Sequence, residues 1–512
     1  MAMSQPRLVS PAGATVLALR ERLLAADYTV DGVTGLLGEV AHRALLRDVS
    51  VPGMRALDGH RSALATLTRL WPLQAGVPLA DADQALPGLV GPLAAAGMLD
   101  RTGDEVRALV DVRPYGDDTS DWWVVCDLTP GLDGGSRRVS TDHVLGISPA
   151  STTMAQLAVR DPIGRALDLG TGCGVQSLHL ATHAREVIAT DVNDRALAMA
   201  ALTAALSDVD FELRSGSLYD PVAREQFDLV ITNPPFVVSP AGGERLVYRD
   251  SGLPGDEVVR RIVTGAPSVL APGGWCQVLA NWAHVAGEPW EGRIAGWVAG
   301  TGCDAWVLQR ELLDPAEYVQ MWLADAGLAG SREWATAYDA WLGWLAEQGV
   351  EGIGMGWLSL RRTDRAEPVV VIEDFPFEIE QPLGAHVRDW GRRVDVLESS
   401  DDDVLSAARP VRAADVVQET YGPPGAADPE RIVLRRGRGV RRARSVDTVV
   451  AALVGACDGE LTIGQILAAL AALLDTEAAT LRADTLPVVR ELVAEGWLDL
   501  EDRPAGAGGR AV

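Results

Sequence analysis

The fold of this chain is constrained most by one segment, Ala166-Leu167-Asp168-Leu169-Gly170-Thr171-Gly172-Cys173-Gly174. It joins an apolar run to three glycines at alternate positions. A buried strand that passes through a glycine-rich turn into a helix is typical of α/β folds that bind nucleotide-like ligands, because glycines let a ligand approach the backbone and the helix start offers free N–H groups. A dinucleotide-binding turn has glycine at the sixth position, where this chain has Val175, so the pattern disfavours NAD.

The glycine-rich turn lies in a region, residues 147–365, in which strand and helix patterns alternate. Such alternation predicts a parallel sheet with crossover helices. We therefore expect an α/β fold with a Rossmann-like sheet of seven strands, and a helical insertion at about 314–348 between the last two. The expected strands are 165–169, 187–191, 211–214, 227–232, 275–280, 305–309 and 352–360.

Candidate ligand contacts follow the first three strands of this sheet. Asp191 ends the second strand, where a carboxylate accepts hydrogen bonds from both ribose hydroxyls of a nucleoside. The turn after the third strand carries Ser217 and Leu218, which we expect at the edge and on the face of the base. The predicted ligand-binding residues are Asp168, Gly170, Thr171, Gly172, Gly174, Asp191, Val192, Ser217, Leu218 and Asn233.

The fourth strand ends in Thr232-Asn233-Pro234-Pro235-Phe236, which indicates chemistry at a planar nitrogen. The lone pair of an amide or exocyclic amine is delocalised, so a site that uses it as a nucleophile needs hydrogen-bond acceptors aimed at its N–H groups. The Asn233 side-chain oxygen and the Pro234 carbonyl are two such acceptors, Pro235 helps to fix the loop, and Phe236 offers a face to a planar group. A simple Pro-Pro turn after a buried strand is the alternative.

At these residues the chain resembles a known family, the class I methyltransferases of the small-domain type, which carry an Asn-Pro-Pro-aromatic motif. The family includes release factor glutamine methyltransferases and N6-adenine and guanine-N2 methyltransferases of RNA and DNA. The resemblance covers about residues 147–365 and implies S-adenosylmethionine as cofactor, with methyl transfer to a planar nitrogen. Phe236 departs from the glutamine-modifying group, which more often has tyrosine there.

Both ends of the chain predict a similar helical module. The stretch Leu86-Pro87 … Gly97-Met98-Leu99-Asp100 recurs as Leu486-Pro487 … Gly496-Trp497-Leu498-Asp499, and Thr462 and Gln465 have the spacing of a capping box. Helix, helix, glycine and short strand form a winged-helix-like outline, which we expect at 1–110 and 445–500. We expect a β-rich connector at 111–146, an irregular or β linker at 366–444 and a disordered tail at 501–512.

The acceptor remains open between a protein side-chain amide, which we slightly favour, and a nucleobase of rRNA, tRNA or DNA. The net charge of −26 argues against broad nucleic-acid binding. However, a basic segment that precedes the C-terminal module is either a solvated strand face or an RNA or ribosome contact. It contains Arg435, Arg436, Arg438, Arg441 and Arg442. A binding protein with a degenerate methyltransferase fold is disfavoured because the motif residues are intact.

Two further stretches lie near the expected site. Residues 148–153 precede the first strand, where enzymes of the family that the chain resembles often contact cofactor or substrate, although a helix N-cap is the simpler interpretation. Residues 248–252 follow the Asn-Pro-Pro loop, where they line an acceptor pocket or form a solvated loop. The five cysteines form no CxxC pair and the histidines lack ligand spacing, so we expect no metal. With no apolar run of about 18 residues we expect no membrane contact, and the cytoplasm is the default compartment.

Overall fold

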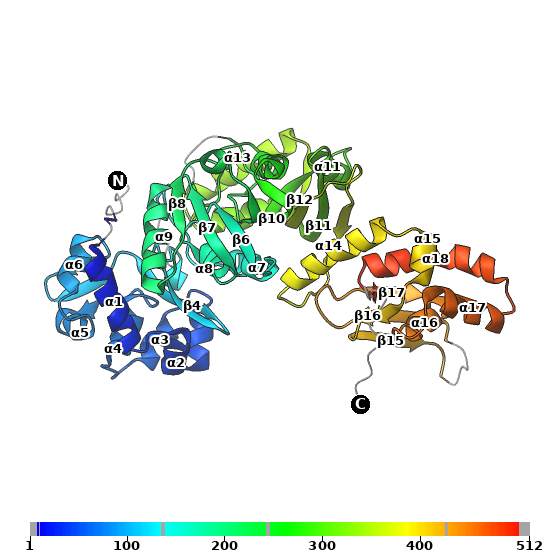
Figure 1. Ribbon diagram of the computed structural model, residues 1–512. Coiled ribbons are helices and arrows are strands. Elements are labelled where there is room, and N and C mark those ends of the chain that lie inside the picture. Colours follow the sequence, from blue (N-terminus) through cyan, green and yellow to red (C-terminus); the bar gives the residue numbers. More distant parts are fainter. Residues whose placement is uncertain (1–7, 10, 135–138, 242–245, 425–428, 501–512) are drawn as a thin grey trace, which may run out of the picture. The chain divides into compact units, whose positions relative to one another are not determined.

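The chain folds into two compact units in a computed structural model that describes residues 8–9, 11–134, 139–241, 246–424 and 429–500 (Figure 1). The first unit comprises residues 1–155 and 160–375, and the second comprises 156–159 and 376–512. The expected disordered tail at 501–512 lies outside the described residues. Within the described residues, no helix combines the length and apolar character that a membrane crossing requires.

An eight-stranded sheet forms the centre of the first unit, and the fold is α/β as predicted. The strand order is β13-β11-β12-β10-β9-β6-β7-β8. Neighbours from β10 to β8 run parallel, β12 is antiparallel to both of its neighbours, and β13 is parallel to β11. The bounds are β6 Ile163–Leu169, β7 Ala184–Asp191, β8 Glu212–Ser215, β9 Phe227–Thr232, β10 Leu270–Val285, β11 Cys303–Leu313, β12 Val350–Arg362 and β13 Val370–Asp374.

The sheet has one strand more than the seven expected from the sequence. β13 falls in the stretch that we expected to be an irregular or β linker, and it pairs with β11 at the edge of the sheet. Its sequence, Val-Val-Ile-Glu-Asp, is too short to show a clear alternation, but the β-branched residues suit an edge position.

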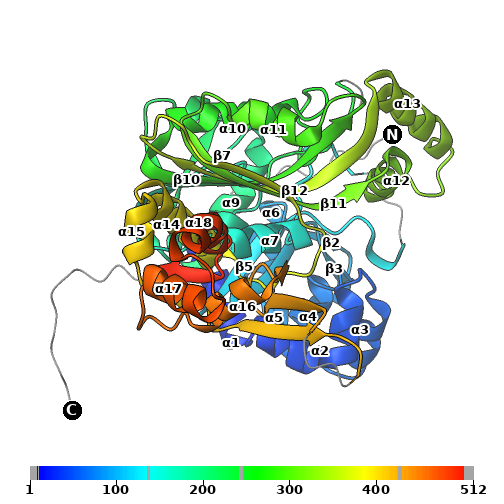
Figure 2. The same cartoon turned by 90° about the vertical axis from the view of Figure 1, so that its right-hand side faces the viewer.

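Helices connect the strands and cover the sheet. They are α7 Pro149–Leu157, α8 Val175–Ala181, α9 Asp194–Ser207, α10 Glu257–Gly265 and α11 Trp290–Val298. Apolar side chains of α10 and α11, such as Val259 and Ile294, pack with Leu167, Ile188 and Val230 of the strands in one buried core. Figure 2 shows α10 and α11 above the sheet and α7 and α9 below it. The loops after β6, β7, β8 and β9 therefore meet at one edge of a rigid, covered sheet.

A helical hairpin, α12 Pro315–Asp325 and α13 Trp334–Glu347, is inserted between β11 and β12, within the stretch 314–348. The two helices lie side by side in Figure 2. Tyr318 and Trp341 are buried together with Val237 and Val238, which follow the Asn-Pro-Pro loop. The tryptophans of this insertion thus contribute to a small core that reaches the loop after β9.

The N-terminal part of the first unit is helical and ends in small antiparallel sheets. The helices are α1 Gly13–Ala25, α2 Val30–Leu45, α3 Val51–Ala56, α4 Ala63–Leu70, α5 Leu79–Ala85 and α6 Val90–Ala95. β1 Val77–Pro78, β2 Leu99–Thr102 and β3 Glu105–Ala108 form a sheet in the order β1-β3-β2. A hairpin follows, β4 Asp111–Asp117 and β5 Ser120–Cys126, and the backbone of β5 bonds the Thr203 and Ser207 hydroxyls of α9.

The second unit contains more helix than the expected linker. α14 Gly384–Glu398 buries Val387, Trp390 and Val394, which recur at a helical spacing within the stretch that we expected to be an irregular or β linker. α15 is Asp402–Ala407, and the sheets are β14–β18 (Pro410–Arg412, Leu498–Leu500) and β15-β16-β17 (Val416–Tyr421, Arg431–Arg436, Ala443–Val446). The remaining helices are α16 Thr448–Gly455, α17 Ile463–Leu473, which begins with the expected Thr462–Gln465 capping box, and α18 Ala478–Ala494.

Candidate active site

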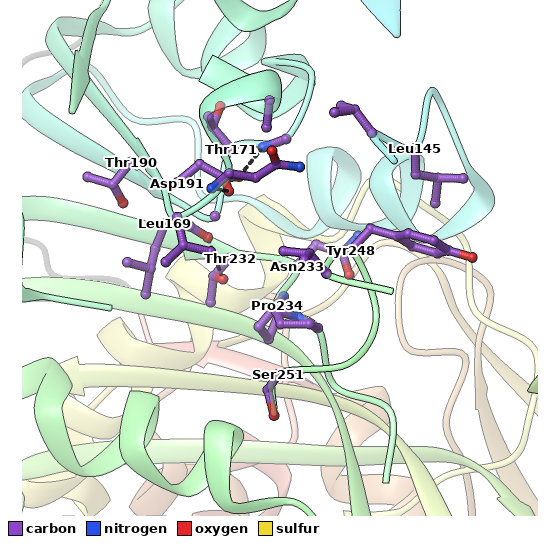
Figure 3. Close-up of a pocket in the computed structure, with 18 of the residues that line it drawn as sticks. Leu145, Leu169, Thr171, Thr190, Asp191, Thr232, Asn233, Pro234, Tyr248 and Ser251 are labelled. Carbon is purple, nitrogen blue, oxygen red and sulfur yellow. Dashed lines mark hydrogen bonds between the residues drawn. The ribbon is translucent and has the colours of Figure 1, made fainter. Parts of the chain in front are cut away.

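A cavity of about 320 Å³ lies at the edge of the sheet where β6, β7, β8 and β9 end (Figure 3). The loops after these four strands supply residues 169–173, 190–193, 216–218 and 232–235 to its lining. Of the residues predicted from the sequence, the cavity brings together Gly170, Thr171, Gly172, Asp191, Val192, Ser217, Leu218, Asn233, Pro234 and Pro235. Asp168, Gly174 and Phe236 lie outside its lining.

Asp168 stabilises the glycine-rich turn from a position outside the cavity lining. Its side chain is 1% exposed, and one carboxylate oxygen accepts hydrogen bonds from the Thr171 hydroxyl (2.6 Å) and the Ser177 hydroxyl (2.7 Å). Burial raises the pKa of Asp168 to about 6, although the two hydroxyl donors oppose the shift. Asp168 is therefore a positioning residue of the turn.

Two glycines of the turn, Gly172 and Gly174, have different surroundings. Gly172 has a φ of +57°, and a Cβ added there would meet no atom within 4 Å, so the backbone is open toward the cavity. At Gly174, with a φ of +89°, a Cβ would come within 3.3 Å of the Phe211 ring and 3.4 Å of Ala200. Gly174 therefore lets the start of α8 lie close to Ala200 and Phe211, whereas Gly172 leaves the backbone open to a ligand.

Asp191 is fixed by backbone N–H groups on both sides. The N–H of Gly172 donates to one carboxylate oxygen (2.9 Å) and that of Asn193 donates to the other (2.8 Å). Burial raises the pKa of Asp191, and the backbone donors oppose that rise. The next residue, Val192, is 57% exposed, and Leu218 lies in the same cavity with a φ of +47°. A carboxylate and apolar side chains that line one cavity suit a nucleoside, which has hydroxyl groups on its ribose and a flat base.

The Asn-Pro-Pro loop presents an unpaired acceptor. The Thr232 hydroxyl donates to the Leu169 carbonyl at 2.6 Å, which ties the end of β9 to the glycine-rich turn. The Asn233 side-chain oxygen is buried and has no hydrogen-bond partner. Because an unpaired buried oxygen costs about 1–3 kcal/mol, the site is built to receive a donor here. Figure 3 shows Asn233 between Asp191 and Pro234.

Phe236 lies behind this loop. Its ring centroid is 6.3 Å from that of Trp322 in an edge-to-face arrangement, and it packs against the core of the sheet. The aromatic side chain that does line the cavity is Tyr248, whose hydroxyl donates to Asp325 of α12 at 2.8 Å and whose ring lies 5.7 Å from that of His143. Burial raises the pKa of Tyr248 far above its usual range, so the phenol stays protonated.

The helical insertion holds this side of the cavity. Arg249, 8% exposed, donates to the Trp322 carbonyl and pairs with Asp325 at 3.5 Å. The Tyr318 hydroxyl accepts from the Val238 N–H (2.9 Å), and Trp341 donates to the Val238 carbonyl (3.1 Å). The backbone that follows the Asn-Pro-Pro loop is thus bonded on both sides by α12 and α13.

Several lining residues were either not predicted from the sequence as ligand contacts or, like Ser148 and Ser151, were interpreted more simply as a helix N-cap. Ser148 and Ser151 begin α7, where the Ser148 hydroxyl accepts from the Ser151 N–H (3.2 Å) as an N-cap while both residues also line the cavity. Gln176 was missed because α8 reads as an ordinary apolar helix. Others are His143, Val144, Leu145, Gly146, Asn193, Val247, Leu253 and Arg261, whereas Tyr248 and Ser251 belong to the stretch 248–252 that was a candidate lining of the acceptor pocket.

Three parts of the chain match known protein families. Residues 146–288 match the family described as "Methyltransferase small domain". Residues 25–109 and 388–499 match two domains of unknown function, DUF7059 and DUF7782 respectively. The methyltransferase match spans β6 to β10 and the four loops that line the cavity.

Curated relatives match the same region. The release factor glutamine methyltransferase of Deinococcus radiodurans is 30% identical over 265 residues, which are 48% of this chain and 93% of that protein. The release factor glutamine methyltransferase of Xylella fastidiosa (strain 9a5c) is 33% identical over 131 residues, 23% of this chain and 47% of the relative, so the chain spans about half of that protein's length. The ribosomal RNA small subunit methyltransferase C of Alcanivorax borkumensis is 30% identical over 118 residues, 23% of this chain and 32% of the relative.

Proposed function

Since the chain belongs to the family of small-domain methyltransferases that includes the release factor glutamine methyltransferases, we propose that it transfers a methyl group from S-adenosylmethionine to a protein side-chain amide. The observation that carries this proposal is the buried, unpaired side-chain oxygen of Asn233, in a cavity that Asp191, Val192 and Leu218 also line.

The cavity fits S-adenosylmethionine by the polarity of its unpaired groups. Among the described residues that line it, the buried side-chain atoms without a hydrogen-bond partner are Oε1 of Gln176 and Oδ1 of Asn233, and both are acceptors. A ligand and an acceptor substrate that bring N–H donors satisfy them, whereas a phosphate group brings only more acceptors. Asp191 adds a carboxylate for the ribose hydroxyls, and Val192 and Leu218 add apolar surface for the adenine.

The bound cofactor supplies an electrophilic methyl group on a sulfonium. The chain's own task is to orient the nitrogen that attacks it. As the delocalised lone pair of an amide is withdrawn into the new bond, positive charge develops on nitrogen and its N–H groups become stronger donors. Asn233 Oδ1 and the Pro234 carbonyl accept these hydrogen bonds, and the two prolines keep the acceptors in place before substrate arrives.

We assign the planar face of the acceptor site to Tyr248. Phe236, predicted from the sequence to offer this face, packs instead against Trp322, where it supports the loop from behind. The Tyr248 ring is held by its hydrogen bond to Asp325, so a planar amide has a fixed aromatic surface beside Asn233.

A protein acceptor is favoured over a nucleobase by the surroundings of the basic segment. Arg435 pairs with Glu419 (3.0 Å), Arg436 with Asp415 (2.9 Å) and Arg441 with Glu378 (3.1 Å). These three of the five arginines are paired with carboxylates of their own unit, which lowers the net positive charge that the segment offers to phosphates. The relative that acts on ribosomal RNA keeps nucleobase methylation as the second candidate. That activity would weaken steeply as salt is raised, whereas amide methylation need not.

The modules at the two ends fit a protein-docking role. In the first, the order is α4, β1, α5, α6 and the hairpin β2–β3, which is the order of a winged helix. In the second, α16, α17 and α18 precede β18, and its partner strand β14 comes from before the helices. α6 contains no basic residue, and Arg482 and Arg490 of α18 pair with Asp403 and Asp402. A nucleic-acid-reading helix needs free positive charge, so we propose that both modules contact protein.

The proposal is tested by replacing Asn233. We expect Asn233→Ala to lower turnover by about 100-fold or more, as loss of a preorganised hydrogen-bonding group does elsewhere. S-adenosylhomocysteine should still bind within a few-fold, and Asn233→Asp, which keeps an acceptor oxygen, should retain more activity than the alanine variant. Near-normal turnover in Asn233→Ala would refute the proposed role of Asn233 as a hydrogen-bond acceptor for the methylated nitrogen.

A further inference from the structure

Gln176 is a buried amide whose orientation is fixed and whose oxygen is unused. It lies in the first turn of α8, is 5% exposed and lines the cavity. Its Nε2 group donates to the Ser151 carbonyl of α7 at 2.7 Å. If the side-chain amide were rotated by 180°, Oε1 would face the Ser151 carbonyl oxygen, and two acceptors would be in contact. The amide orientation is therefore fixed, and Oε1 is the atom that makes no bond to Ser151. Oε1 is buried and has no hydrogen-bond partner.

The order of the strands locates Gln176 relative to the parts of the cofactor. β8 and β7 lie on one side of β6 and supply Leu218 and Asp191, where we place the adenosine. β9 lies on the other side and supplies Asn233, where we place the acceptor nitrogen. The amino-acid end of the cofactor then lies over the turn after β6, next to the start of α8 and therefore beside Gln176.

We infer that Gln176 binds the α-ammonium group of the methionine part of S-adenosylmethionine through Oε1, an inference that rests on the proposed function. An ammonium brings three N–H donors and no acceptor, which is the complement of an unpaired oxygen. A hydrogen bond from a charged donor is stronger than one from a neutral donor, and in the free protein the unpaired oxygen carries a desolvation penalty that the ligand relieves. The bond to Ser151 keeps the amide aimed while the site is empty of ligand.

The alternative is that Gln176 only ties α8 to α7 through Ser151. The two roles make different predictions for ligands that share the adenosine but differ at the amino-acid end. S-adenosylhomocysteine carries both the ammonium and the carboxylate, decarboxylated S-adenosylmethionine carries the amine alone, and 5′-methylthioadenosine carries neither.

The test is calorimetric binding of these three ligands to the full-length wild type, Gln176→Met and Gln176→Glu. In Gln176→Met, which keeps the length of the side chain without its amide, we expect affinity for the two amine-bearing ligands to fall by about 10- to 100-fold. Binding of 5′-methylthioadenosine should change by less than about twofold, a limit set well below the loss of one hydrogen bond. Gln176→Glu loses the bond to Ser151 but keeps an acceptor, so it should retain the preference for amine-bearing ligands.

Three results would overturn the inference. An equal loss for all three ligands in Gln176→Met would mean that Gln176 acts only by positioning α7. An unchanged affinity for S-adenosylhomocysteine would mean that Oε1 makes no contact. A loss for S-adenosylhomocysteine but not for decarboxylated S-adenosylmethionine would move the contact to the carboxylate. Absence of binding to the wild type would instead refute the proposed function itself, so the two failures are distinguishable.

Discussion

The backbone N–H of Gly172 donates to the carboxylate of Asp191 across 2.9 Å, and this bond joins the turn after β6 to the end of β7. With the second bond from Asn193, both carboxylate oxygens of Asp191 are held by backbone N–H groups. The glycine-rich turn and the acidic strand end therefore form one preorganised unit, in which Asp191 is aimed before any nucleoside binds.

Asp191→Ala should weaken binding of S-adenosylhomocysteine by about 10- to 100-fold, because two hydrogen bonds to a carboxylate are lost and the turn at Gly172 loses its anchor. Titration calorimetry measures this directly. Asp194→Ala is the matched control, since Asp194 is an exposed carboxylate three residues further on that does not line the cavity. Equal affinities in the two variants would contradict the ribose assignment.

Asp168 should make stability fall between acidic and neutral pH. Its pKa is about 6 in the folded chain against an ordinary value of 3.8, so the folded state holds a proton that the unfolded state has already released. The stabilisation is fully present below 3.8, the pKa in the unfolded chain, and is lost as the pH rises through 6, the pKa in the folded chain. The unfolding free energy should fall by up to about 3 kcal/mol over this range. Urea unfolding of the wild type and of Asp168→Asn should be measured from pH 4 to 7. As the pH rises, the unfolding free energy of the variant should increase relative to that of the wild type. Parallel curves would rule out this role.

Tyr318 should matter for activity as well as for stability. Its hydroxyl accepts from the Val238 N–H and from Asn281, both at 2.9 Å, so Tyr318→Phe leaves two buried donors unpaired beside the Asn-Pro-Pro loop. We expect a loss of about 1–3 kcal/mol in unfolding free energy and a lower turnover. Tyr338→Phe, which breaks one bond to the Ala316 carbonyl in the same insertion, should lower stability alone. Similar turnover in the two variants would mean that the bonds from Tyr318 do not influence the active site.

Tyr248 should affect the acceptor and not the cofactor. Tyr248→Leu removes the aromatic face, whereas Tyr248→Phe removes only the hydrogen bond to Asp325. We expect the leucine variant to need a higher acceptor concentration for the same methylation rate, the phenylalanine variant to lose less, and both to bind S-adenosylhomocysteine normally. Phe236→Leu should mainly lower thermal stability. If Phe236→Leu raised the acceptor requirement and Tyr248→Leu did not, the planar face would belong to Phe236 after all.

The features that the sequence predicted well are local ones. Gly172 and Asp191 belong to one strand–turn–helix–strand unit, and the parallel order of such units follows from the alternation of strand and helix patterns. The α/β fold was confirmed for this reason, and the cavity gathers most of the predicted ligand contacts because loops at the ends of neighbouring parallel strands must meet.

The features that the sequence did not predict depend on packing between distant segments. The ring of Phe236 is directed by Trp322, some 86 residues away, and Tyr248 by Asp325, so neither orientation can be read from the motif. Gln176 appeared as one more residue of a helix because its partner, Ser151, lies before β6. β13 was missed because five residues carry too little periodicity to be distinguished from a loop.

Methyl transfer to a protein side-chain amide can be tested by following the fate of a labelled methyl group. The enzyme is incubated with methyl-labelled S-adenosylmethionine and a lysate from a strain that lacks its gene, and the product is treated separately with protease and with nuclease. We expect protease to release the label, nuclease to leave it bound, and Asn233→Ala to incorporate almost none. Label that is released by nuclease and retained after protease would refute amide methylation and identify a nucleobase as the acceptor.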